Sequence, residues 1–178
     1  KGLLRASGDI ISLLHSDDFY ADDEVLGSVA DIFKRNNLQL VYGDAEFFAA
    51  KDPKRTIRYY KSGFLSKKNL SYGQMPAHPS MFFHKNIYQE LEGFKIDYKI
   101  AADYEFLCRL VAHRNVRSHY ARKSLVRMQL GGLSTAGFKS TITLNKEVRR
   151  SLKENGIYSN YAMILSKYPL KILGFLSL

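Results

Sequence analysis

The chain has 178 residues, 46% hydrophobic and 13% aromatic, so it can bury the core of one domain and is not a disordered segment. Its formal net charge of +10, from 27 Lys and Arg against 17 Asp and Glu, favours a polyanionic neighbour: a phosphorylated substrate, anionic lipid or nucleic acid. Cys108 is the only cysteine, which excludes an intrachain disulfide and a thiolate metal cluster and agrees with a reducing cytoplasm.

The first third of the chain predicts a helix end followed by strand, helix and strand. Residues 2–7 are typical of the last turns of a helix, and because domains rarely begin there, we expect earlier parts of the fold to lie outside this sequence. Residues 10–14 predict a buried strand, and residues 25–33 have the apolar spacing of an amphipathic helix. Residues 38–48 predict a second strand, interrupted at Gly43-Asp44. This order is typical of a parallel βαβ unit.

The middle of the chain alternates irregular and regular segments. Residues 51–60 are polar and basic and contain a proline, which favours a connection, and residues 72–80 carry Gly73, Pro76 and Pro79, which favour an irregular loop. Periodicity then predicts a short strand at 81–83, a short helix at 85–91, a stronger helix at 100–113, an imperfectly alternating basic segment at 116–129 and a helix at 139–155.

The last residues form a separate segment, so we divide the chain into a domain over 1–155 and an apolar, basic segment over 156–178. Lys167, Pro169 and Lys171 argue against a transmembrane span. Two alternatives stay open: an amphipathic segment in the membrane interface, and a helix packed back on the domain.

Two adjacent carboxylates, Asp17 and Asp18, follow the strand predicted at 10–14. In α/β folds, ligands bind at the carboxyl ends of strands. Carboxylate oxygens there suit Mg²⁺ or Mn²⁺ and a ligand that bears phosphate. The alternative is a turn with an Asp cap.

A third carboxylate, Asp103, stands at the start of the helix predicted at 100–113. It is either an N-cap or a general base held on a rigid element. Glu105 is expected to face away from it at the surface, and Asp44 is expected to be a turn residue after Gly43.

A series of short motifs, in this order, resembles the family 2 glycosyltransferases of the GT-A fold. The motifs extend over most of residues 1–135 and are Lys1-Gly2-Leu3, Ser7-Gly8-Asp9, Leu14-His15-Ser16-Asp17-Asp18, His78-Pro79-Ser80-Met81-Phe82-Phe83, Gly93-Phe94, Ala102-Asp103-Tyr104-Glu105-Phe106, Arg109-Leu110 and Gly131-Gly132-Leu133-Ser134. The resemblance implies an α/β fold: a GT-A (Rossmann-like) mixed sheet flanked by helices. It also implies that the fold is incomplete at the N-terminus, where the family has its nucleobase pocket.

Members of this family transfer a sugar, with inversion, from a nucleotide-diphosphate donor to an acceptor hydroxyl. By resemblance, Asp17 matches the last Asp of the metal-binding D-x-D motif, with Asp18 beside it, and His15 replaces the first Asp. His15 and Ser16 are then expected to contact the donor, and a histidine can still hydrogen-bond a ribose hydroxyl. Asp103 matches the catalytic base.

The same resemblance places His78 and Pro79 beside the acceptor. Arg127, in the basic segment, is a candidate second clamp on the donor phosphates. A diphosphate leaving group needs no protein acid when a metal offsets its charge, so one base is sufficient.

These features together predict a metal-dependent glycosyltransferase that uses Mg²⁺ or Mn²⁺. Its acceptor would be lipid-linked or a polysaccharide, as in bacterial cell-surface polysaccharide synthesis, and its location the cytoplasmic face of the membrane, as a peripheral protein. Without the first strands, residues 1–178 alone are expected to bind nucleotide poorly. The alternatives are an inactive truncated transferase and a non-catalytic basic module for nucleic acid or anionic membrane. Nucleic acid is disfavoured as a partner because the basic residues match no known motif.

Overall fold

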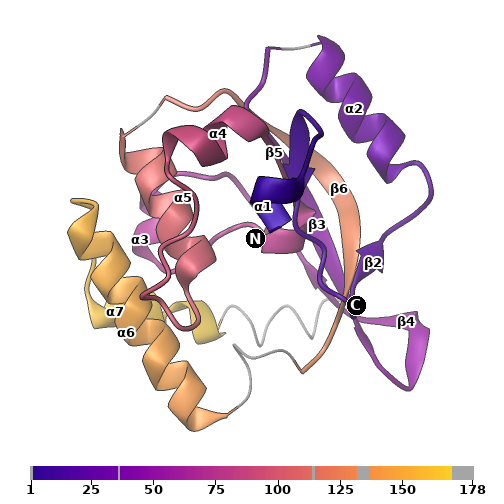
Figure 1. Ribbon diagram of the computed structural model, residues 1–178. Coiled ribbons are helices and arrows are strands. Elements are labelled where there is room, and N and C mark those ends of the chain that lie inside the picture. The colour runs from indigo at the N-terminus through magenta and orange to yellow at the C-terminus, as the bar shows by residue number, and fades with distance from the viewer. Residues whose placement is uncertain (1, 36, 114, 132–136, 170–178) are drawn as a thin grey trace.

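The computed structural model describes residues 2–35, 37–113, 115–131 and 137–169 (Figure 1). The strands are β1 (Ile10–Ser12), β2 (Phe19–Tyr20), β3 (Leu40–Ala49), β4 (Asp52–Tyr60), β5 (Met81–His84) and β6 (Ser118–Gln129). The helices are α1 (Gly2–Arg5), α2 (Val25–Arg35), α3 (Lys67–Ser71), α4 (Lys85–Glu90), α5 (Ala102–His113), α6 (Phe138–Glu154) and α7 (Tyr161–Leu165), with a 3-10 turn, η1 (His78–Ser80).

All six strands join one mixed sheet in the order β1-β5-β3-β6-β2, and β4 pairs with β3. β3 is parallel to β6 and antiparallel to β5, and β5 is also antiparallel to β1. β1 and β3 therefore run in the same direction, as the βαβ pattern predicts, but β5 lies between them. The strands and helices predicted from periodicity are present, although several begin or end one to two residues away from the predicted limits.

Two expectations for the second strand and its successor were wrong. Gly43-Asp44 does not interrupt the strand, because β3 continues through both residues to Ala49. Residues 51–60 are not a connection, because Asp52–Tyr60 is a strand that forms a hairpin with β3. Pro53 stands at the exposed start of this strand, where a missing N–H is tolerated. The β-forming residues that follow it, Thr56 to Tyr60, outweigh the charge on which the expectation rested.

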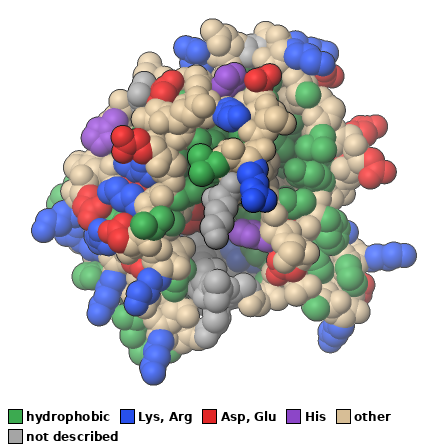
Figure 2. Space-filling view, in the orientation of Figure 1, with side chains coloured by type: hydrophobic (Ala, Val, Ile, Leu, Met, Phe, Trp, Pro, Cys, Tyr) green, Lys and Arg blue, Asp and Glu red, His purple; other side chains and the backbone are tan. Residues whose placement is uncertain are grey.

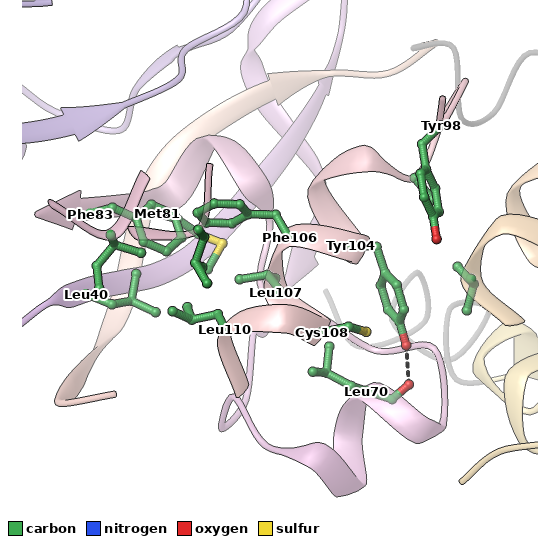
Figure 3. Close-up of a cluster of buried hydrophobic side chains, with 14 of the residues drawn as sticks. Leu40, Leu70, Met81, Phe83, Tyr98, Tyr104, Phe106, Leu107, Cys108 and Leu110 are labelled. Carbon is green, nitrogen blue, oxygen red and sulfur yellow. Dashed lines mark hydrogen bonds between the residues drawn. The ribbon is translucent and has the colours of Figure 1, made fainter. Parts of the chain in front are cut away.

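The larger hydrophobic cluster lies between the sheet and α3–α6 (Figure 3). α5 contributes an almost continuous buried run, from Tyr104 to Cys108, and its residues pack against Leu40, Met81 and Phe83 of the strands. The Tyr104 hydroxyl donates a hydrogen bond to the carbonyl of Leu70, which ties α5 to α3. Burial raises the pKa of the Cys108 thiol to about 12, so the thiol is protonated and acts as a small apolar side chain.

The opposite face of the sheet is covered by α2. Val25 and Val29, one turn apart, pack against Val41, Phe82 and Leu125 of the three central strands. The helix has this one apolar stripe and a polar outer face, which is the pattern that the sequence predicts for residues 25–33.

The described part of the C-terminal segment packs on the domain. Ile157 and Ile164 belong to the larger core cluster, and the Ser159 hydroxyl donates to the Ser71 carbonyl at 2.6 Å. Residues 170–178 lie outside the described residues, so the membrane-interface alternative for them stays a prediction. Among the described helices, none is both long and apolar enough to cross a bilayer.

The strands β3 and β6 are packed closely together at Gly43. Two extra residues of β6 are accommodated between the pairs Tyr42–Tyr120 and Asp44–Ser124. A methyl group at Gly43 would lie 2.7 Å both from Cδ1 of Leu125 and from the Lys123 carbonyl oxygen. The absence of a side chain here is therefore a packing requirement.

We expect Gly43→Ala to lower the free energy of unfolding by about 1–3 kcal/mol, because the added methyl overpacks a rigid part of the sheet. Urea denaturation measures the change. The matched control is Gly27→Ala in α2, where no atom lies within 4 Å of the added methyl, and it should be stabilising by about 0.5–1 kcal/mol. Equal stabilities of Gly43→Ala and the parent protein would contradict the packing argument.

Candidate functional site

The loop after β1 carries the predicted donor-side residues. His15, Ser16 and Asp17 are exposed, whereas Asp18 is half-buried and accepts a hydrogen bond from the Gln129 backbone N–H at 3.1 Å. Burial raises the pKa of Asp18 above its ordinary value, the hydrogen bond from Gln129 opposes the rise, and the charge of Asp17 adds to it. The end of β6 thus fixes the loop while leaving Asp17 open to a ligand.

His78 links this loop to Asp103. The His78 ring is half-buried in η1, and burial is the main reason that its pKa is lowered. The charge of Asp103 opposes this shift and the charge of His15 adds to it. Both charges therefore act at the His78 ring. Segments far apart in the sequence, around residues 15, 78 and 103, therefore converge.

Asp103 stands in the first turn of α5, and its Oδ1 accepts a hydrogen bond from the Tyr104 N–H at 2.7 Å. The turn before the helix is held by Glu147 of α6. Its carboxylate accepts hydrogen bonds from the backbone N–H groups of Lys99, Ile100 and Ala101 at 2.8–2.9 Å. Burial alone would raise the pKa of Glu147, but these donors outweigh it and hold the pKa below its ordinary value. Glu147 was not singled out from sequence, where it is one glutamate on a polar helix.

Glu105 is not at the surface, as its spacing from Asp103 suggested, but is completely buried. Its carboxylate pairs with Arg109, one turn along α5, at 2.8 Å and with Lys95 at 3.1 Å. Arg109 also donates to the carbonyls of Leu91 and Gly93. The expectation failed because a paired carboxylate can be buried, and the i, i+4 spacing of Glu105 and Arg109 was the available signal.

Asp44 is not a turn residue but a buried carboxylate in the middle of β3, 2% exposed. It accepts hydrogen bonds from the hydroxyls of Tyr120 at 2.6 Å and Tyr59 at 2.8 Å and from the Ser62 N–H at 2.8 Å. Burial, and then the hydrogen bond to Asp44, raise the pKa of Tyr120 to about 12, so the phenol remains a donor. No sequence pattern distinguishes this aspartate from one in a turn.

The carbonyl of Gly43, next to Asp44, supports the turn that carries His78. It accepts from the Ser80 hydroxyl at 2.7 Å and from the Ser62 hydroxyl at 2.5 Å. Ser80 and Pro79 are buried in η1, and the predicted contact of Pro79 with the acceptor stays a prediction. The His78 ring packs edge-on against Phe94, with ring centroids 5.7 Å apart.

Arg127 faces the β3–β4 hairpin. Its guanidinium lies 3.5 Å from Glu46, donates to the Lys54 carbonyl at 3.1 Å and packs over the rings of Phe19 and Phe48. These contacts hold the loop after β1 against the hairpin. The predicted contact of Arg127 with the donor phosphates stays a prediction.

Within the described ranges, no three His, Cys, Asp or Glu side chains are grouped closely enough to hold a metal ion by themselves. A Mg²⁺ site made of one or two carboxylates and substrate phosphates needs no such group. Asp17 and the free oxygen of Asp18 have the hard-oxygen chemistry for that kind of site. Gly132, Leu133 and Ser134, which contributed to the resemblance, lie outside the described residues.

A separate hollow of about 330 Å³ lies on the α2 side of the sheet. Its lining is mostly apolar, and none of the predicted site residues contributes to it; the residues are Ile10, Ser12, Tyr20, Leu26, Ala30 and Phe82. It is therefore not the space between His15, His78 and Asp103.

Comparison with known proteins relates this geometry to solved structures. Staphylococcus aureus TarS 1–349 in complex with UDP-GlcNAc matches 84% of this chain with a TM-score of 0.58 and 13% identity, and the complex with UDP matches 82% with a TM-score of 0.54 and 14% identity. The chain shares its fold with TarS. The α/β class, with a mixed sheet flanked by helices as in glycosyltransferase structures, is confirmed.

The match is partial in both directions of comparison. The chain spans 44% and 42% of these two TarS structures, and 26% of a longer TarS structure that it matches with a TM-score of 0.56. No family model and no curated protein matches the sequence. The similarity to TarS is therefore one of fold.

The role of Glu147 in holding the turn before Asp103 can be tested by the pH dependence of stability. Because its pKa is depressed in the folded protein, the stability it contributes is present above its unfolded pKa and is lost as the pH falls through the lower folded value. We expect Glu147→Gln to be clearly less stable than the parent at pH 7 and to approach it at pH 3. Urea denaturation at both pH values measures this, with the exposed Glu24→Gln as control. A stability difference that does not shrink on acidification would contradict the assignment.

Proposed function

We propose that the chain carries the metal-binding and acceptor side of a glycosyltransferase that moves a sugar, with inversion, from a nucleotide-diphosphate donor to a hydroxyl group. The proposed acceptor is lipid-linked or a polysaccharide, as in the synthesis of a bacterial cell-surface polymer at the cytoplasmic face of the membrane. The observation that carries the proposal is that the charges of both His15 and Asp103 act at His78, although the three residues lie far apart in the sequence. The fold shared with TarS, which has been solved with UDP-GlcNAc and with UDP, supports the choice of donor class.

Asp103 is the proposed general base. An inverting transfer needs one group that takes the proton from the acceptor hydroxyl while its oxygen attacks the anomeric carbon from the side opposite the diphosphate. Asp103 is held for this task at a helix N-terminus, where a carboxylate is stabilised in its charged form. His78 beside it is kept neutral by burial, so it can hydrogen-bond the acceptor without repelling a cation.

Asp17 and Asp18 are the proposed holders of Mg²⁺ or Mn²⁺. A bound divalent cation offsets the charge that develops on the departing diphosphate. Asp17 is exposed and free to reach the ion, and the hydrogen bond from Gln129 leaves one oxygen of Asp18 available. His15 and Ser16 are proposed to contact the donor from the same loop, which the resemblance places beside the ribose.

We expect Asp103→Asn to lower the rate of transfer by about 10²–10⁴-fold and to leave donor affinity unchanged, since the amide cannot accept the proton but can keep the hydrogen bond from Tyr104. The assay uses the protein in the form in which the cell makes it, with donor binding measured by calorimetry. The control is Asp23→Asn, an exposed aspartate outside the site, which should retain both properties. Undiminished turnover by Asp103→Asn would remove Asp103 as the base.

The metal proposal has its own test, which does not require turnover. Addition of Mn²⁺ should raise the affinity for the UDP-sugar in the parent protein, and Asp17→Asn should abolish this gain while leaving the metal-free affinity unchanged. Calorimetric titrations of both proteins, each with and without Mn²⁺, give the four affinities for the UDP-sugar. An equal gain from Mn²⁺ in the two proteins would exclude Asp17 from the metal site.

A further inference from the structure

The hairpin formed by β3 and β4 is attached to both halves of the candidate site. At its base, the Tyr60 hydroxyl donates to the Met75 carbonyl at 2.6 Å, which fixes the segment that leads to His78. On its other side, Phe48 packs on Phe19 with ring centroids 5.0 Å apart, directly after Asp17 and Asp18. The hairpin is therefore connected to both sides of the candidate site, and β4 projects from the rest of the sheet (Figure 1).

The second strand of this hairpin with its flanking residues, 51–61, carries five cations and one carboxylate, and we call it the basic arm. Lys51, Lys54, Arg55 and Lys61 are exposed. Figure 2 shows Lys and Arg side chains that project into solvent at the lower right, where Figure 1 places β4. The basic arm is thus a charged surface and not merely a charged stretch of sequence.

The two acidic residues of β3 do little to offset this charge, because one is buried and the other is paired. Asp44 is buried under its tyrosines. Glu46 accepts a hydrogen bond from the Thr56 hydroxyl at 2.6 Å and lies 3.5 Å from Arg127. In this way the fold buries one carboxylate and pairs the other with a cation, and Asp52 is the exposed acid of the basic arm.

We propose that the basic arm binds a polyanionic acceptor polymer, a chain with repeated phosphate or carboxylate groups, and guides it towards Asp103. This inference rests on the proposed function. Lys54 and Lys61 lie at opposite ends of a nearly extended segment that spans roughly 23 Å. A single phosphate could contact one or two of these cations, whereas a polymer with repeated charges is long enough to contact cations along the whole segment. The attachment of the arm to the site favours the molecule on which the site acts over an unrelated polyanion.

The test compares two triple variants with equal loss of charge. The arm variant is Lys54→Gln, Arg55→Gln and Lys61→Gln, and the control is Lys139→Gln, Lys146→Gln and Lys153→Gln on the exposed face of α6. Binding of fluorescent inorganic polyphosphate and of polygalacturonate is measured by anisotropy between 50 and 200 mM salt, to cover both kinds of anionic group. Circular dichroism and urea denaturation check that both variants are folded.

We expect the parent and the control to bind at least one of the two polymers with a steep salt dependence. The slope of log K against log salt is negative. Its magnitude should be smaller in the arm variant by about 2–3, because one contact is lost for each cation removed. Equal losses in the two variants would show a general effect of net charge and overturn the proposal. Tighter binding of duplex DNA, or of phosphatidylglycerol vesicles, with the same dependence on the arm would assign the surface to a different partner and also overturn it.

The polymer assay needs neither donor nor metal, so its result is separate from the transfer assay on Asp103→Asn. Loss of polymer binding in the arm variant, with donor binding retained, supports the arm. An arm variant that transfers to a polyanionic acceptor as fast as the parent does, at the same low acceptor concentration, would disprove the guiding role and leave the proposed transferase function in place.

Discussion

The arrangement of this molecule depends on one point in the sheet, where β3 passes β6 at Gly43 and Asp44. The missing side chain lets the two strands approach, and the next residue places a carboxylate in the space beside them. A buried charge is costly unless it is paired or hydrogen-bonded, and here Tyr59, Tyr120 and the backbone of Ser62 supply the donors. These donors come from β4, β6 and the segment after the hairpin, so one carboxylate holds three separate parts of the chain together.

The same point supports the candidate site. The Gly43 carbonyl receives the Ser80 hydroxyl and so positions the turn that carries His78. Asp103 is supported in a comparable way. Glu147 of α6 accepts hydrogen bonds from the turn before α5, and the buried Glu105 of α5 pairs with Lys95 in the loop that leads to this turn. The acids near the site thus divide into two kinds. Some are exposed and available for a ligand, such as Asp17. Others, such as Glu147 and Glu105, form hydrogen bonds or ion pairs that fix the nearby backbone.

Much of the architecture follows from local patterns in the sequence. The helices α2 and α5 have clear apolar stripes, and short apolar runs mark β1 and β5, so these elements are predictable from periodicity. β4 is not, because charged residues on an edge strand have the composition of a loop. For the site, the carboxylates that face solvent could be proposed from their place after a strand or before a helix. Asp44 and Glu147 could not be assigned, because their hydrogen-bond partners are distant in sequence. For Glu105, the spacing to Arg109 indicates an ion pair, but its complete burial is visible only in the folded chain.

The buried thiol of Cys108 has a practical consequence. A thiol reacts with alkylating reagents as the thiolate, and burial in the core keeps this group protonated and inaccessible while the protein is folded. The folded chain should therefore not react with a thiol-specific dye at its native cysteine. A cysteine introduced at an exposed position of β4 could carry a single dye, and the distance from the hairpin to a labelled polymer could then be followed by energy transfer without first removing the native residue.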